Sequence, residues 1–103
     1  MIKNYQIQFA ISAYTDMDNF ERFMLKDCQA LRTCAKQFAE LDKHLDWLEQ
    51  FAELPAINVE LSIKYGKILR SIRFGKKMAI VYSIDNNIVM IQRLMPQSMI
   101  MTN

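Results

Sequence analysis

The last third of the chain carries a pattern that few folds can accommodate. Between residues 65 and 96, three short runs rich in apolar residues are separated by two turn sequences. Apolar runs of this length between turn residues are typical of strands, and turns this short join antiparallel neighbours. We therefore predict three consecutive antiparallel strands at residues 68–74, 78–84 and 88–94, with Pro96 ending the last one.

The turn residues and the faces of these strands can be assigned in more detail. Gly75 and Lys76 make the first turn, and residues 85–87 (Asp-Asn-Asn) make the second, because Asp and Asn tolerate left-handed backbone. In the middle strand, Met78, Ile80, Tyr82 and Ile84 share one face. In the first strand, we expect Ile68, Ile72 and Phe74 on one face and Leu69 and Arg73 on the other.

The first half of the chain predicts one strand and two helices. Residues 3–9 alternate as a half-buried strand, and Ser12 offers a cap for a helix over residues 13–25. Apolar residues at alternating steps of three and four predict a long amphipathic helix that Pro55 stops: Leu31, Cys34, Phe38, Leu41, Leu45 and Leu48. Residues 56–63 form a connector with weak strand or helix character.

The resulting order, β-α-α-β-β-β, predicts the α+β class. A two-helix hairpin packs on one face of a mainly antiparallel four-stranded sheet, and residues 1–103 make one domain. The first strand joins the sheet at an edge or beside a later strand. Trp47 and Phe51 lie off the helical stripe, where they could cover the sheet edge or form a partner surface; we favour burial.

Charge is divided unequally along the chain. Residues 61–103 carry seven Lys or Arg and one acid, whereas the first 60 residues carry six Lys or Arg and ten acids. The formal net charge of +2 thus combines about −4 in the first part with about +6 in the second. Such asymmetry favours binding to a polyanion or to an acidic partner.

Several classes of function are disfavoured by composition. No segment has the roughly 18 apolar residues that a membrane span needs, and the N-terminus lacks an apolar signal-peptide core, so we expect a cytoplasmic protein with no membrane partner. Cys28 and Cys34 are six residues apart on one expected helix and are predicted to be free thiols. No Cys or His cluster suggests a metal, and we predict no cofactor.

Segments at both ends of the chain resemble the RelE/ParE superfamily of bacterial toxins. Residues 5–9, followed by Ser12-Ala13 and Asp16-Met17, resemble the first strand and first helix of that family. Leu69-Arg70 and then residues 80–85 and 88–94 resemble its strand meander. Since these pieces occur in the family's order and spacing, the resemblance covers nearly the whole chain.

The resemblance implies a growth-inhibiting toxin of a type II toxin–antitoxin module. A cognate acidic antitoxin would neutralise it, and the assemblies allowed are a homodimer or a heterotetramer with the antitoxin. ParE-like members bind and poison DNA gyrase, whereas RelE-like members cut mRNA in the ribosomal A site. A third alternative is a non-toxic interaction domain of the same fold.

Departures from the RelE pattern favour the ParE-like alternative. RelE-like enzymes resemble one another in placing an Arg and a Tyr or His after the last strand, but residues 96–103 contain neither of these nor a Lys. Ala79 stands where the RelE pattern has Arg, and His44, the one histidine, falls in a helix away from the sheet. Tyr65 and Tyr82 are expected to be packing residues. We therefore expect a binding protein rather than an enzyme.

Basic residues and the apolar tail are the candidate site. For a nuclease, the catalytic residues would be Lys67, Arg70, Arg73 and Arg93. The wider set expected to bind the target or the antitoxin is Lys67, Arg70, Arg73, Lys76, Lys77, Arg93, Met95, Met99 and Ile100. Cations on a strand also protect sheet edges and aid solubility, and that alternative stays open. The tail at residues 95–101 is expected to be an apolar contact surface.

Overall fold

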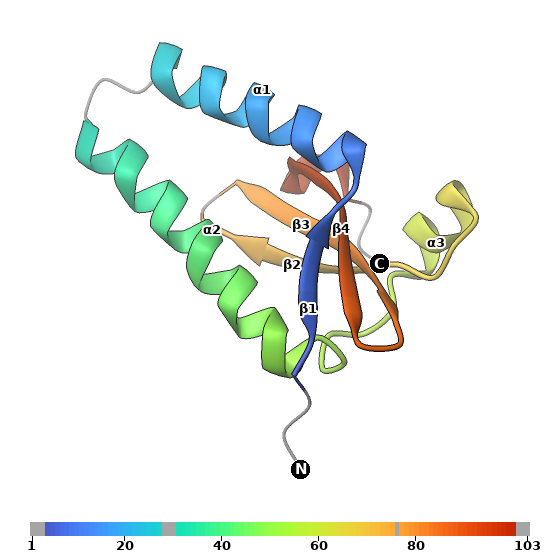
Figure 1. Cartoon of the computed structure of the whole chain (residues 1–103). Helices are drawn as coiled ribbons and strands as arrows, with labels where there is room; N and C mark the ends of the chain where they lie inside the picture. The colour runs from blue at the N-terminus through green and yellow to red at the C-terminus, as the bar shows by residue number, and fades with distance from the viewer. Residues whose placement is uncertain (1–3, 28–30, 76, 101–103) are drawn as a thin grey trace.

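Strands and helices follow one another in the predicted order, with one short helix added. The computed structural model describes residues 4–27, 31–75 and 77–100. The elements are β1 (Gln6–Phe9), α1 (Ile11–Asp27), α2 (Leu31–Phe51), α3 (Val59–Tyr65), β2 (Arg70–Phe74), β3 (Met78–Asp85), β4 (Ile88–Pro96) and a 3-10 turn, η1 (Gln97–Met99) (Figure 1). The α+β class is therefore confirmed.

The sheet has the order β1-β4-β3-β2. The last three strands form the predicted antiparallel meander, and β1 pairs in parallel with β4 at one edge. Gly75 and Asn86 have φ values of 60° and 55°, the left-handed backbone that these tight turns require. Lys76, the other residue of the first predicted turn, lies outside the described residues.

The two long helices cover one face of the sheet and form the main core there. Ala13 and Phe20 of α1 and Leu41 and Leu48 of α2 are buried against that face, as their helical spacing predicts. Buried strand residues meet them from the sheet: Phe74, Ile80, Tyr82, Val89, Ile91 and Leu94. The hairpin of α1 and α2 thus packs as expected (Figure 1).

A second, smaller core lies on the opposite face of the sheet. The sequence had predicted no element to cover this face. Ala79 and Val81 of β3 alternate with the main-core residues and are fully buried. Leu61 of α3 and Ile100, which follows the C-terminal turn, pack with them in this core, together with Met95 of β4. The sheet is therefore packed on both faces.

Helix α3 has clear end signals within the segment predicted as a weak connector. The side chain of Asn58 accepts a hydrogen bond from the Leu61 backbone N–H at 3.1 Å, and Gly66 ends the helix with a φ of 70°. The chain then returns to α3, where the Leu69 N–H donates to Ser62 Oγ at 2.9 Å. Because this bond holds residue 69 beneath α3, β2 begins only at Arg70.

Two predictions about local structure are wrong. Ile68 is 67% exposed and Leu69 is buried in the second core, the reverse of what a strand starting at residue 68 implied. Ser12 is not the cap of α1, because the helix begins at Ile11 and the Ser12 hydroxyl donates to the carbonyl of Gln92 at 2.7 Å. The hydroxyl that was expected to accept a hydrogen bond from a helix N–H instead donates one to a residue 80 positions away in the chain.

Removing the Tyr82 hydroxyl is expected to destabilise the fold. Tyr82 is fully buried, and its hydroxyl donates to the carbonyl of Ala52 at 2.8 Å. Tyr82→Phe leaves that carbonyl without its donor, so the free energy of unfolding should fall by about 1–2 kcal/mol in urea titrations. Tyr14→Phe, at an exposed tyrosine, is the matched control and should change little.

Alkaline pH provides a second readout for the same variant. Burial raises the pKa of Tyr82 above its ordinary value, against the opposing charge of Arg70. The unfolded chain ionises this phenol near pH 10 while the folded chain keeps it neutral, so stability is lost as pH rises above about 10. Tyr82→Phe should flatten that loss, and an unchanged slope would contradict the assignment.

Candidate functional site

The basic residues of the sheet segment are distributed over different parts of the molecule. Arg70 lies on the helix-covered face, where its Nη1 donates to the carbonyls of Glu53 at 3.0 Å and Pro55 at 2.6 Å. These bonds fasten the chain after α2 to the start of β2. The guanidinium of Arg70 therefore has a structural role at this position.

Arg93 is held by an acid of α1. Its Nε donates to Asp16 Oδ2 at 2.6 Å and its Nη2 to Oδ1 at 3.2 Å. Hydrogen bonding to Asp16 raises the pKa of Arg93; partial burial opposes this rise, and the charge of Asp16 and the neighbouring Tyr65 reinforce it. The guanidinium is thus fixed in place and permanently charged.

A polar pocket of about 240 Å³ opens beside Arg93, on the side of the sheet that carries α3. Its walls come from three segments far apart in the chain: Ser12, then Tyr65, Lys67 and Leu69, then Gln92 and Arg93. The Gln92 amide donates to Ser83 Oγ at 3.0 Å, which fixes part of the wall. With an ammonium, a guanidinium, a phenol and the Ser12 hydroxyl around it, this pocket suits an anion such as a carboxylate or a phosphate.

Four of these lining residues were missed by sequence reasoning. Ser12 was assigned to a helix cap, Tyr65 to packing, Leu69 to a strand face and Gln92 to no role. Each reaches the pocket because α3 folds back over the sheet and α1 starts beside β4. No spacing in the sequence signals this proximity, since the contacts depend on the tertiary arrangement.

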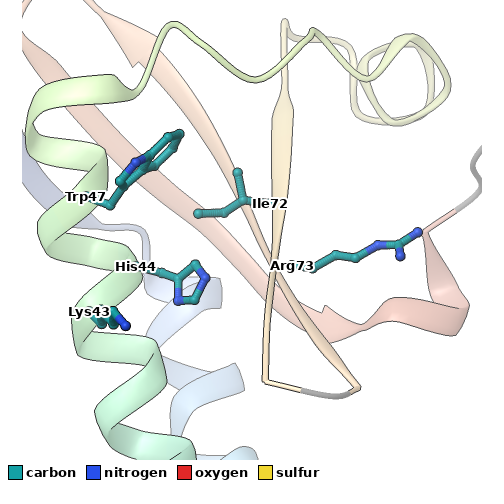
Figure 2. Close-up of a pocket in the computed structure, with 5 residues that line it drawn as sticks. All are labelled: Lys43, His44, Trp47, Ile72 and Arg73. Carbon is teal, nitrogen blue, oxygen red and sulfur yellow. The ribbon is translucent and has the colours of Figure 1, made fainter.

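The four residues proposed for a nuclease are not brought together. Lys67 and Arg93 share the polar pocket, whereas Arg70 is bonded to the chain after α2. Arg73 lines a different groove through its position on β2, and Figure 2 shows its side chain extending away from α2. Lys77 lines yet another hollow, and Lys76 lies outside the described residues.

An apolar groove of about 400 Å³ runs between α1 and the end of the sheet. Phe20, Lys77, Met95 and Met99 contribute to its walls, and Arg93 separates it from the polar pocket. The tail contributes less free surface than expected: of the three tail residues proposed for the site, Met95 and Ile100 are buried in the second core, whereas Met99 is 60% exposed. The physical reason is that the uncovered sheet face binds its own chain's tail. Met101, the last residue of the predicted tail, lies outside the described residues.

A third hollow, here called the aromatic groove, lies between α2 and β2. Its walls are Lys43, His44, Trp47, Ile72 and Arg73, and its volume is about 330 Å³. Figure 2 shows Trp47 and His44 reaching from α2 toward Ile72 of β2. Two expectations are corrected here: His44 is not remote from the sheet, and Trp47 and Phe51 are not buried, being 38% and 40% exposed.

Some classes of site are not found. Within residues 4–27, 31–75 and 77–100, no group of three or more His, Cys, Asp or Glu could hold a metal ion. No helix in the same ranges has both the length and the apolar character needed to cross a bilayer. Cys28 lies outside the described residues, and so does the side chain of Cys34, so the free-thiol prediction stays a prediction.

Comparison with known proteins adds no family. No protein-family model matches the chain, and no curated protein matches it.

Proposed function

We propose that this protein is a growth-inhibiting toxin of a toxin–antitoxin module that acts by binding its target, with DNA gyrase as that target and an acidic antitoxin as its inhibitor. The proposal starts from the resemblance of the strand meander and first helix to ParE-like toxins. The observation that carries it is the dispersal of the cations: Arg70 and Arg93 are engaged in bonds within the fold, and Arg73 points elsewhere. A surface of separated charges supports binding better than it supports phosphodiester cleavage.

Inhibition of gyrase supercoiling is the first test. The purified chain at micromolar concentration should block supercoiling while leaving a translation extract active. Lys67 and Lys77 are exposed, and reversing both charges to Glu should raise the concentration needed by about tenfold, because complementary charge strengthens and speeds association. The matched control is Lys26→Glu, an exposed lysine at the end of α1, which should inhibit like the parent protein.

One specific observation favours a second function, a ribosome-dependent mRNA endonuclease. Tyr65, Lys67 and Arg93 share the polar pocket, and they supply a phenol, an ammonium and a guanidinium. RNA cleavage by attack of the ribose 2′-oxygen on phosphorus needs a base for its proton, an acid for the leaving 5′-oxygen and cations for the phosphate. The second function would replace the first if gyrase supercoiling is not inhibited, if mRNA is cleaved, and if this cleavage is lost in Tyr65→Phe. A chain without any growth defect would instead be an interaction domain of this fold.

A further inference from the structure

Helix α3 carries apolar side chains on two opposite sides. Leu61 faces the sheet and is buried in the second core. Val59 and Ile63 stand two residues before and two residues after it, so each lies about 200° away around the helix. Their side chains are 63% and 78% exposed. The outward side of α3 therefore presents branched aliphatic side chains to the solvent.

Two further isoleucines lie beside this outward side. An antiparallel bridge joins Ile57 to Arg70, and a backbone hydrogen bond continues the pairing one residue further toward α3. The same register brings Ile68 beside Val59. Because Leu69 is buried in the second core, Ile68 before it points outward, and it is largely exposed. Four neighbouring residues thus form an exposed aliphatic surface, here called the α3 patch: Ile57, Val59, Ile63 and Ile68.

The α3 patch protrudes from the molecule and has no hollow of its own. Figure 1 shows α3 at the periphery, across the sheet from the two long helices. None of the four patch residues lines the polar pocket, the apolar groove or the aromatic groove. Anchor residues of protein interfaces sit in closely packed pockets, whereas fluid acyl chains close around side chains that simply project. The shape of the patch therefore favours a lipid surface over a folded partner.

The charge at the border of the patch is positive. Lys64 and Lys67 are exposed, and each adjoins one of the patch isoleucines in the chain. Over residues 54–68 the one acid is Glu60, and its Oε2 atom is shielded from solvent. Glu53, just before this segment, accepts a hydrogen bond from a hydroxyl of the N-terminal segment. The two lysines are therefore the charges that a surface approaching the patch would meet.

We infer that the α3 patch binds the surface of an anionic lipid bilayer. Its aliphatic side chains enter the boundary between headgroups and acyl chains, and Lys64 and Lys67 lie at the level of the lipid phosphates. Tyr65 lies between these lysines in the chain and is more than a third exposed, and its amphipathic ring suits the same boundary. Such binding uses no spanning segment, so it differs from the membrane contact that the sequence argued against. The inference goes beyond the proposed function and does not depend on it.

Sedimentation with lipid vesicles tests the inference. The full chain is mixed with vesicles of equal parts phosphatidylcholine and phosphatidylglycerol, or with vesicles of phosphatidylcholine alone. The protein should bind the anionic vesicles at least about tenfold more tightly than the neutral ones, because lysines near an anionic surface favour binding. Raising the salt concentration from about 0.1 M to about 1 M shortens the Debye length from about 10 Å to about 3 Å, and should release most of the bound protein.

Matched variants separate the apolar contribution from the charged one. Ile63→Ser and Lys64→Glu should each weaken binding to the anionic vesicles by about tenfold, the first by removing buried methylenes and the second by reversing a charge. The controls are Ile11→Ser, at an isoleucine that is 86% exposed at the start of α1, and Lys26→Glu at the end of that helix. Both controls should bind like the parent protein. Since all four positions are exposed, circular dichroism should show the same fold in every variant.

Several results would overturn the inference. Absence of sedimentation with the anionic vesicles would exclude bilayer binding, and equal binding to neutral vesicles would exclude the role of the lysines. Equal effects of Ile63→Ser and Ile11→Ser would exclude the α3 patch. Self-association without vesicles that is lost in Ile63→Ser would assign the patch to a second copy of this chain. The assay involves neither gyrase nor growth, so its outcome and that of the supercoiling test are independent.

Discussion

Replacing Phe74 by Ala is expected to lower the free energy of unfolding by about 3–5 kcal/mol, the range found for large aromatic residues in cores. Phe74 is the last residue of β2 and is almost completely buried. Its ring meets Phe20 of α1 edge to face, with centroids 5.9 Å apart, and Phe20 in turn meets Phe38 of α2 at 5.4 Å. One substitution therefore removes the ring that ties the sheet to both long helices.

Urea denaturation followed by circular dichroism measures this loss. Ile68→Ala is the matched control, because Ile68 precedes β2 in the same segment and is largely exposed. It should change stability by less than about 0.5 kcal/mol, the usual limit for surface positions. If Phe74→Ala cost no more than Ile68→Ala, the three-ring contact would not be a main part of the core. Fluorescence of Trp47 gives an independent transition, and coincidence of the two curves checks that unfolding has two states.

The helix-covered side of the fold could be predicted from local pattern. Phe38, Leu41, Leu45 and Leu48 of α2 all pack on the main core, and their spacing alone indicated this. In β3, alternation assigned the inward residues from Met78 to Ile84 correctly. Local periodicity is sufficient to predict which side chains are buried where one face of an element packs on one continuous apolar layer.

The other side of the sheet could not be predicted in this way. Ala79 and Val81 lie on the face of β3 that a two-layer fold with helices on one side leaves uncovered, yet both are fully buried. Their cover comes from Leu61 of α3 and from Met95 and Ile100, three short apolar contributions with no shared period. Because β3 is buried on both faces, nearly every residue in its middle is apolar. The spacing of Met78, Ile80, Tyr82 and Ile84 identified one buried face, but nothing in it showed that the second face is covered as well.

The same limit applies to the candidate site. Charge counting indicated that the C-terminal part is basic, but it could not show which cations are free to bind. Arg70 and Arg93 are engaged by carbonyls at residues 53 and 55 and by Asp16, partners 15 to 77 residues away in sequence. Trp47, which was expected to be buried, instead became the exposed wall of a groove. Tertiary structure thus decides which side chains are free to contact a partner. In this fold Met95 and Ile100 of the tail are buried, whereas Trp47 beside β2 is partly exposed.

Asp16 is the acid on which a second large effect is expected. Its carboxylate accepts hydrogen bonds from Arg93 Nε and Nη2 and also from the Leu94 backbone N–H. The side chain of Asp16 is 11% exposed, so it differs from an ordinary surface ion pair, which contributes little. Through these bonds, Asp16 fastens α1 to β4. It also holds the Arg93 guanidinium between the polar pocket and the apolar groove.

Asp16→Ala should therefore lower the free energy of unfolding by about 1–3 kcal/mol, because it leaves the Leu94 N–H without its acceptor and removes the carboxylate from the Arg93 guanidinium, whose side chain is 36% exposed and keeps contact with water. Asp16→Asn keeps an acceptor for Leu94 but loses the charge, and should cost about half as much, consistent with the greater strength of charge-assisted bonds. The control is Asp18→Ala, an exposed acid on the same helix. In a double-mutant cycle, Arg93→Ala should couple to Asp16→Ala by about 1 kcal/mol or more. Additive effects of the two substitutions would show that the pair does not hold α1 to β4, and that Arg93 is free to bind a partner.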